Sequence, residues 1–229
     1  MSDFSTFEKQ IGHTFADRRL IEQAFTHRSY LNENRTPGRE HNERLEFLGD
    51  AVLELVVTEF LYAKYPAKPE GDLTAYRAAL VNTQSISEAA SKLGMNAYLL
   101  LSRGEARDTG RARQIILANA FEALIGAIYL DSGYAAARAF IDAQLFHKTD
   151  EVVSKRLWQD AKSRLQELAQ GTLGVTPTYE LSSQSGPDHA RQFVIAAYIG
   201  REKVATGEGR SKQEAEQDAA QKALAAKGW

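Results

Sequence analysis

The chain has 229 residues, of which 43% are hydrophobic and 25% charged, the usual balance of a soluble globular protein. It has no cysteine, so disulfide scaffolds, thiolate zinc sites and cysteine nucleophiles are excluded. The formal charge of −2 is uneven, because residues 155–229 carry 11 Lys and Arg against 9 Asp and Glu. The N-terminus lacks a secretory pattern, and the longest apolar stretch is too short and interrupted to span a membrane. We therefore expect a cytoplasmic protein with no membrane partner.

Every periodic segment before residue 147 has the apolar spacing of an α-helix. The spacing predicts helices over 16–31, 43–65, 71–82, 85–94, 115–130 and 134–146, with a charged loop at 102–113. The second of these follows Asn42, a favourable N-cap residue, and stops at Pro66. Residues 1–147 are therefore predicted to form an all-α domain.

The pattern changes after a polar segment at 148–158, which we interpret as a linker with room for some helix. In the second domain, 159–229, we expect a helix at 163–170, three strands at 176–183, 191–200 and 201–209, and a helix at 211–227. Apolar residues alternate in the middle strand, so Phe193, Ile195, Ala197 and Ile199 share one face. The prediction is a small α+β domain of α-β-β-β-α order, with both helices on one face of an antiparallel sheet.

Four carboxylates, Glu43, Glu46, Asp50 and Glu54, are spaced three and four residues apart, so they share one face of the predicted helix. A solvated acidic face is the simplest explanation for such a strip. However, apolar residues flank it, which leaves only a narrow part of the helix wet. Gly49 also lies mid-helix, where it costs ~1 kcal/mol relative to Ala. A glycine in this place usually permits another group to approach the backbone closely.

The segment 115–130 repeats the arrangement, with Asn119 and Glu122 followed by Gly126. Two such helices can cross and pool oxygen ligands of the kind that Mg²⁺ or Mn²⁺ prefers. A pooled carboxylate site of this type activates water against a phosphodiester. A di-iron helical protein of another chemistry also pools carboxylates, but that class typically uses Glu-x-x-His pairs, and the sequence has none.

Three motifs carry a resemblance to a known family: HNERLEFLGDAVL at 41–53, EGDLTAYRAALV at 70–81 and ILANAFEALIGAIYLD at 116–131. In this order they resemble the signature of bacterial ribonuclease III, the double-stranded-RNA-specific endonuclease. The C-terminal α-β-β-β-α unit is similar to the family's double-stranded-RNA-binding domain. The resemblance implies a homodimer that depends on Mg²⁺, with Mn²⁺ able to substitute, and that has no small-molecule cofactor. It also implies cleavage of double-stranded RNA to 5′-phosphate and 3′-hydroxyl ends, in processing of ribosomal and other structured transcripts.

The resemblance also assigns roles to the acidic residues. Glu46 and Glu122 match the family's metal-ligand glutamates. Asp50 matches its catalytic aspartate, which binds metal or orients the attacking water, so Asp50 and Glu122 are the expected catalytic residues. Glu43 and Glu70 match further acidic positions that line the RNA-binding valley.

Three residues near these positions need separate interpretation. Phe47 matches the apolar residue that inserts into the partner subunit; the alternative is an ordinary core phenylalanine. Glu54 matches no family site, so we expect a surface charge. Asn119 stands where the family usually has a metal-binding aspartate, and its amide oxygen can ligate Mg²⁺ without adding charge. The missing charge leaves one alternative function, a catalytically silent double-stranded-RNA-binding protein.

Duplex RNA hides its base edges, so proteins recognise it by shape, 2′-hydroxyls and phosphates. Three segments of the second domain can make such contacts. They are the first helix, the loop between the first two strands, and the N-terminus of the last helix, which attracts phosphate. Without the resemblance, His189 would be interpreted as a plain loop residue. The expected RNA-binding residues are Ser163, Gln166, Glu167 and Gln170 in the helix, Pro187, Asp188 and His189 in the loop, and Arg210, Ser211 and Lys212 before and within the last helix.

Overall fold

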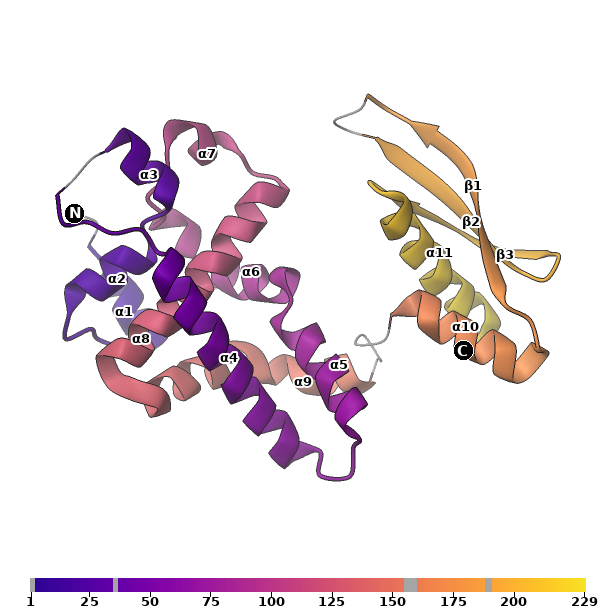
Figure 1. Ribbon diagram of the computed structural model, residues 1–229, viewed down its shortest axis with the longest axis horizontal. Coiled ribbons are helices and arrows are strands. Elements are labelled where there is room, and N and C mark those ends of the chain that lie inside the picture. The colour runs from indigo at the N-terminus through magenta and orange to yellow at the C-terminus, as the bar shows by residue number, and fades with distance from the viewer. Residues whose placement is uncertain (1–2, 35–36, 155–159, 188–190) are drawn as a thin grey trace. The chain divides into compact units, whose positions relative to one another are not determined.

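The computed structural model describes residues 3–34, 37–154, 160–187 and 191–229, in two compact units, Met1–Trp158 and Gln159–Trp229 (Figure 1). We call them the helical unit and the C-terminal unit. In the helical unit the elements are α1 (Ser5–Ile11), α2 (Arg18–Ala24), α3 (Arg28–Glu33), α4 (Glu43–Lys64), α5 (Glu70–Val81), α6 (Thr83–Lys92), η1 (Met95–Ala97), α7 (Arg103–Arg107), α8 (Arg111–Leu145), η2 (Phe146–Lys148) and α9 (Thr149–Ser154).

The helix expected at 16–31 is two helices, α2 and α3, because the chain between them pairs with a distant segment. The Leu100 amide donates to the Phe25 carbonyl at 2.9 Å, and the His27 amide donates to the Leu100 carbonyl at 3.1 Å. Thr26, in the middle of this junction, is fully buried. Sequence periodicity reports only local spacing, so it missed this break.

A short helix, α7, lies within the segment expected to be a charged loop. It begins where the Ser102 hydroxyl oxygen accepts a hydrogen bond from the Glu105 amide at 3.2 Å, a side-chain cap. The Arg113 guanidinium donates to the Glu105 carbonyl and so joins the end of α7 to the start of α8. The expectation of a loop over 102–113 was therefore wrong for most of the segment, since α7 occupies Arg103–Arg107 and α8 begins at Arg111.

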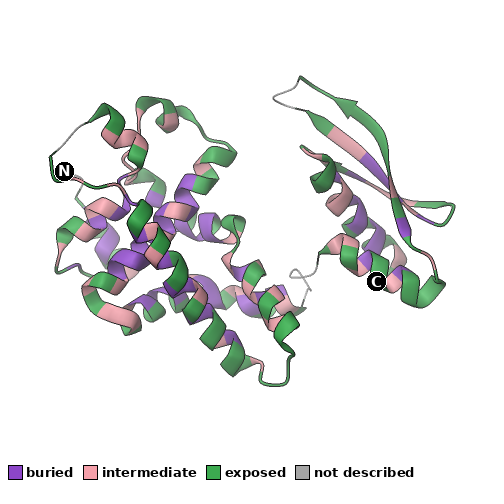
Figure 2. Cartoon of the chain, viewed as in Figure 1, coloured by how far each residue is buried: buried purple, intermediate pink, exposed green. Residues whose placement is uncertain are grey.

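The long helix α8 forms the core of the helical unit, and its middle is buried on almost every side (Figure 2). It contains both helices expected at 115–130 and 134–146. They meet at Gly133, where φ of 78° breaks the helical geometry. Among the described residues, one stretch, Arg111–Ser154, is long and apolar enough to cross a membrane, but 61% of its most apolar window is buried inside the unit. This stretch is packed as a core helix.

Helices α4 and α8 cross with their backbones in direct contact, as the two mid-helix glycines predicted. A Cβ on Gly49 would overlap the Glu122 carbonyl oxygen and lie 2.9 Å from the Gly126 amide nitrogen. A Cβ on Gly126 would overlap the Leu45 carbonyl oxygen. Only glycine allows this approach, because any other residue would push the helices apart. The crossing therefore places Glu46 and Asp50 of α4 beside Glu122 of α8.

Helix α9 lies in the segment that the sequence suggested as the beginning of a linker. Thr149 and Val152 of this helix are buried against the rest of the helical unit. On the exposed side of α9, Asp150 forms a 2.6 Å ion pair with Lys64 at the end of α4. The described part of this segment is thus packed, and residues 155–159 lie outside the described structure.

The C-terminal unit has the predicted α-β-β-β-α order, with α10 (Ala161–Leu173), β1 (Pro177–Ser185), β2 (Gln192–Ile199), β3 (Glu202–Gly209) and α11 (Lys212–Lys227). The antiparallel sheet has the order β1-β2-β3, with Pro177 opposite Ile199 and Phe193 opposite Gly209. The register shifts between Leu181 and Ser183 in β1 and between Ala197 and Tyr198 in β2. Both helices cover one face, where Ala197 and Ile199 join their core (Figure 1). Helix α10 continues through Gly171 to Gly174, whose φ of 70° ends it.

Replacing Gly49 by alanine should separate α4 from α8. The added Cβ meets fixed backbone, which cannot rotate away, so we expect a loss of about 3 kcal/mol in the free energy of unfolding, at the upper end of overpacking effects. Gly71→Ala in α5 is the matched control, because nothing lies within 4 Å of its Cβ position. That variant should be neutral or gain up to about 1 kcal/mol. Urea unfolding followed by circular dichroism measures both; equal effects would contradict the proposed close contact.

Candidate active site and nucleic-acid interface

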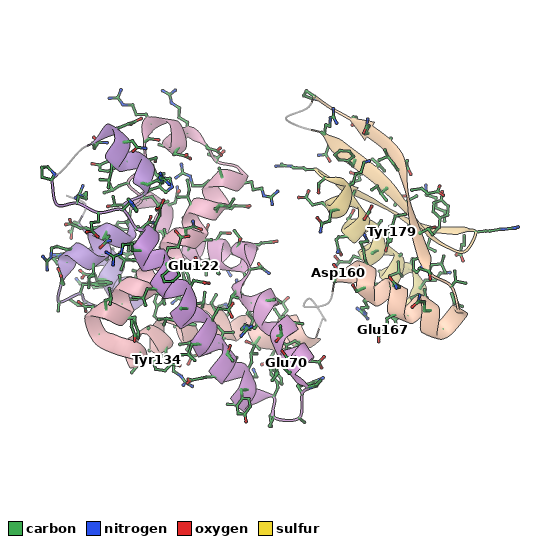
Figure 3. The ribbon with its side chains drawn as sticks, viewed as in Figure 1. Glu70, Glu122, Tyr134, Asp160, Glu167 and Tyr179 are labelled. Atoms are coloured by element: carbon green, nitrogen blue, oxygen red, sulfur yellow. The ribbon has the colours of Figure 1, made fainter. Side chains whose placement is uncertain are left out.

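The acidic strip of α4 and the polar pair of α8 meet where the two helices cross, and Figure 3 places Glu122 on α8 at its passage by α4. Glu46, Asn119 and Glu122 are partly buried, whereas Asp50 is exposed to solvent. The three carboxylates influence one another electrostatically, as the pKa values of Glu46 and Glu122 show. These are the groups from which the sequence predicted a pooled metal site.

Glu122 is the most perturbed of these groups. Burial, followed by the charges of Asp50 and Glu46, raises the pKa of Glu122 to about 7. Burial is also the main cause that raises the pKa of Glu46, with Glu43 and Asp50 adding to it, and a hydrogen bond from the Asn119 side chain opposes the rise. Near neutral pH the site therefore holds excess negative charge, which a cation would relieve.

The two ends of the acidic strip differ from its middle. Glu43 pairs with Arg28 at 3.2 Å, and Glu54 pairs with Arg77 of α5 at 2.7 Å. Glu54, expected to be a surface charge, is thus part of a partly exposed ion pair between two helices. Within the described ranges, no lysine, arginine or histidine forms such a pair with Glu46, Asp50 or Glu122.

The donor set fits a hard divalent cation. Carboxylate and amide oxygens are the ligands that Mg²⁺ and Mn²⁺ prefer, and in the described part of the chain the three carboxylates form no ion pair with a basic side chain. Among the described residues, no three His, Asp or Glu side chains lie close enough together to bind a metal ion at once. Glu46, Asp50, Asn119 and Glu122 are the residues that would hold the ion.

Glu70, expected to line the same valley, is not part of this cluster within one chain. It begins α5, where its carboxylate accepts a 2.9 Å hydrogen bond from the Thr74 hydroxyl. Figure 3 shows it well separated from Glu122. A single chain therefore brings together Glu46, Asp50 and Glu122 but leaves Glu70 apart.

Phe47 is 82% exposed, which excludes the alternative of a core phenylalanine. Next to it, Leu130 of α8 is 55% exposed. Both residues border a hollow of about 570 Å³, whose other lining residues are Gln23, Glu40, Arg44, Leu45 and Leu48. A protruding aromatic side chain thus stands beside an apolar recess on the same surface.

The predicted RNA-binding side chains of α10 lie together on one exposed side. They recur at helical spacing, with Leu165 and Ala169 buried on the opposite side. One of their side chains is already engaged, since the Gln170 amide donates to the Thr176 hydroxyl at 3.0 Å. The exposed set is Ser163, Gln166, Glu167 and Gln170.

The other two expected RNA-binding segments are only partly described. In the loop between β1 and β2, Pro187 is exposed, and Asp188 and His189 lie outside the described residues. At the start of α11, the Ser211 hydroxyl oxygen accepts a 3.1 Å hydrogen bond from the Glu214 amide. Arg210 and Lys212 on either side of this cap are exposed. Two cations therefore flank the positive end of a helix.

Two residues near the site have contacts that sequence reasoning missed. Asn42 was predicted to cap α4, but its side chain makes no capping hydrogen bond. Its amide instead donates to the Ala24 carbonyl at 3.2 Å. Arg28, which pairs with Glu43, belongs to a different helix, so no spacing rule connects them. Asn42 is also only 2% exposed.

Comparison with known proteins places these features in context. A family model described as "Ribonuclease-III-like" matches residues 17–149, and a "Double-stranded RNA binding motif" matches residues 161–227. A "Ribonuclease 3" of Nitratiruptor sp. is 42% identical over 224 residues, covering 98% of this chain and 96% of the relative. A "Ribonuclease 3" of Bacillus licheniformis is 47% identical over 222 residues, covering 97% and 89%. The solved nuclease domain of ribonuclease III from Campylobacter jejuni is 38% identical, with a TM-score of 0.56 over 62% of this chain and 98% of that chain.

The raised pKa of Glu122 predicts a pH-dependent stability in metal-free protein. The folded state binds this proton more tightly than the unfolded state, whose glutamate titrates near 4.5. Stability from this group is therefore full below pH 4.5 and is lost as pH rises through about 7.

Glu122→Gln keeps the neutral form at every pH, so it should exceed wild type at pH 8 by on the order of 1–2 kcal/mol after solvent screening. At pH 5 the two proteins should be nearly equal. Urea unfolding in EDTA at both pH values checks this. An advantage of the same size at pH 5 and pH 8 would contradict the prediction.

Proposed function

The chain belongs to the ribonuclease III family and is an endoribonuclease specific for double-stranded RNA, and on this premise we propose that it is a Mg²⁺-dependent, homodimeric, cytoplasmic enzyme. Its products carry 5′-phosphate and 3′-hydroxyl ends, and its substrates are ribosomal precursors and other structured transcripts. The observation that carries the metal dependence is the uncompensated cluster of Glu46, Asp50 and Glu122 at the crossing of α4 and α8.

The side chains divide the chemistry according to their burial. Glu46 and Glu122 are partly buried and lie close enough for their charges to interact, so they supply fixed carboxylate oxygens to the ion. Asn119 supplies an uncharged amide oxygen. Asp50, exposed at the rim, is accessible to the attacking water and orients it. A bound Mg²⁺ would polarise that water and offset charge on the scissile phosphate. Attack of water on phosphorus breaks the P–O3′ bond, so phosphate stays on the 5′ end of one product and the departing O3′ takes a proton.

The proposed homodimer is supported by Phe47 and the hollow beside it. In a twofold dimer the same patch occurs on both subunits, so a projecting group and its receiving pocket must lie on one surface. Phe47 and the recess that includes Leu48 and Leu130 meet this requirement. Within one chain Glu70 lies apart from Glu122 (Figure 3). In a dimer, Glu70 of one subunit could line the RNA-binding valley beside the acidic cluster of the other.

The C-terminal unit contributes binding of the duplex. The polar face of α10 offers hydrogen-bonding groups for 2′-hydroxyls, and Arg210 and Lys212 offer charge to phosphates. These contacts carry no base readout, so selection among transcripts must come from duplex shape and accessibility.

Wild type should cleave a perfect RNA duplex only when a divalent ion is added, and it should need more Mg²⁺ than Asn119→Asp. One more charge about 4 Å from the ion contributes on the order of 1 kcal/mol or more, so the Mg²⁺ concentration for half-maximal cleavage should fall roughly tenfold. A Mg²⁺ titration of cleavage, with duplex binding followed separately in Ca²⁺, measures this difference.

Glu122→Gln serves as the control for the same titration. It should lose cleavage while keeping duplex affinity, because the C-terminal unit is unchanged. If wild type cleaved nothing at any Mg²⁺ or Mn²⁺ concentration while Asn119→Asp did, the proposal would fail. The protein would then act on duplex RNA by binding alone.

Phe47→Ala tests the homodimer. Removing an aromatic side chain that is buried only on association should weaken the dimer by about 3–5 kcal/mol. Monomer stability should hardly change, because Phe47 is exposed in one chain. Sedimentation velocity over a concentration series should show dissociation, whereas Leu181→Ala, exposed in the C-terminal unit, should behave as wild type. A monomeric wild type, or an undisturbed dimer in Phe47→Ala, would rule out this contact.

A further inference from the structure

Asn42 lies immediately before the helix that carries Glu46 and Asp50, yet it does not serve that helix as a side-chain cap. It is 2% exposed, and a buried amide is expected to be satisfied by hydrogen bonds. Its side-chain amide donates to the Ala24 carbonyl at 3.2 Å, and its backbone amide donates to the Thr26 carbonyl at 2.9 Å. Two hydrogen bonds therefore attach the start of α4 to the end of α2.

The segment that receives Asn42 is itself hydrogen-bonded to Leu100, which forms an isolated β-bridge with Thr26 shortly before α7. Leu100 exchanges hydrogen bonds with Phe25 and His27 on the two sides of Thr26. The Thr26 hydroxyl donates to the Glu22 carbonyl and satisfies the end of α2. Asn42 is therefore attached to a segment whose Phe25 and Thr26 are fully buried and hydrogen-bonded on both sides.

A helix fixed at one point can still pivot about that point. The backbone contact of Gly49 with α8 fixes α4 at the crossing. Asn42 lies seven residues earlier, about 10 Å along the helix axis, and gives a second fixed point. Glu46 stands between the two, and its amide donates to the Asn42 carbonyl at 2.9 Å. The pair of fixed points sets both the distance and the angle at which Glu46 faces α8.

We propose that Asn42 is a positioning residue for the metal-binding carboxylates, acting through its side-chain hydrogen bond to the Ala24 carbonyl. This inference rests on the proposed function, because it assumes that Glu46 and Glu122 hold a divalent ion. Asn42 touches neither ion nor RNA in this role. It holds α4 at the angle at which Glu46 and Asp50 face Glu122 across the crossing.

The test separates this tertiary bond from helix capping. Asn42→Ser and Asn42→Asp both keep a good capping side chain, but Asp cannot donate to Ala24, and Ser is too short to take the place of the amide. Asn82→Asp is the control. The exposed Asn82 side chain caps α6 by accepting from the Ser85 amide and also donates to the Ala79 carbonyl at 3.0 Å. Aspartate keeps the cap and loses the donation, away from the acidic cluster. Full-length proteins are compared for Mn²⁺ binding by electron paramagnetic resonance, for duplex binding in Ca²⁺, and for cleavage.

We expect both Asn42 variants to bind Mn²⁺ about tenfold more weakly and to lose a similar factor in kcat, as outer-shell substitutions do. Duplex affinity should stay within about twofold, since the C-terminal unit is intact, and Asn82→Asp should match wild type. A loss in Asn42→Asp is the more telling result, because its added negative charge would by itself tighten cation binding.

Three results would overturn the inference: unchanged Mn²⁺ affinity in both Asn42 variants, equal losses in Asn82→Asp, or variants that are unfolded at 25 °C. The last would assign Asn42 to folding. Failure of wild type to bind Mn²⁺ is a different outcome, and it would contradict the proposed function itself.

Discussion

The backbone contact between α4 and α8 is the constraint on which the rest of the helical unit depends. Gly49 and Gly126 allow carbonyl and amide groups of the two helices to approach where a side chain would keep them apart. Once the helices are that close, groups on their adjoining strips share one small volume. Glu46, Asp50 and Glu122 are near one another for this reason, and burial then makes their charges costly.

The same contact links folding to chemistry. Carboxylates that are close and partly buried oppose folding when no cation is bound, so an ion that balances them also stabilises the crossing. The acidic residues at the two ends of the strip, Glu43 and Glu54, each form an ion pair. Each has an arginine from a neighbouring helix, whereas the central three have none within the described residues. Selective lack of a partner distinguishes a binding site from an acidic surface.

Part of this arrangement could be predicted from sequence because it is local. The acidic spacing in α4 and the break at Gly133 follow from the helix period. The strict alternation expected in β2 is not observed, because Ile195, Ala196 and Ala197 are all buried and the pairing with β3 shifts after Ala197. The mid-helix glycines predicted a crossing because their disadvantage needs a compensating contact. Other features required three dimensions. The division between α2 and α3 comes from pairing with Leu100, and Asn42 binds Ala24 instead of capping its own helix. The exposure of Phe47 likewise follows from how α4 is rotated in the fold.

Location of the ion itself tests the central claim most directly. Crystals of the full-length protein grown with Mn²⁺ would show it by anomalous scattering, without dependence on activity. The account predicts the strongest anomalous peak at the crossing of α4 and α8, with carboxylate oxygens of Glu46 and Glu122 as ligands. Saturating Mn²⁺ with no peak there, or a dominant peak ligated by other residues, would contradict it.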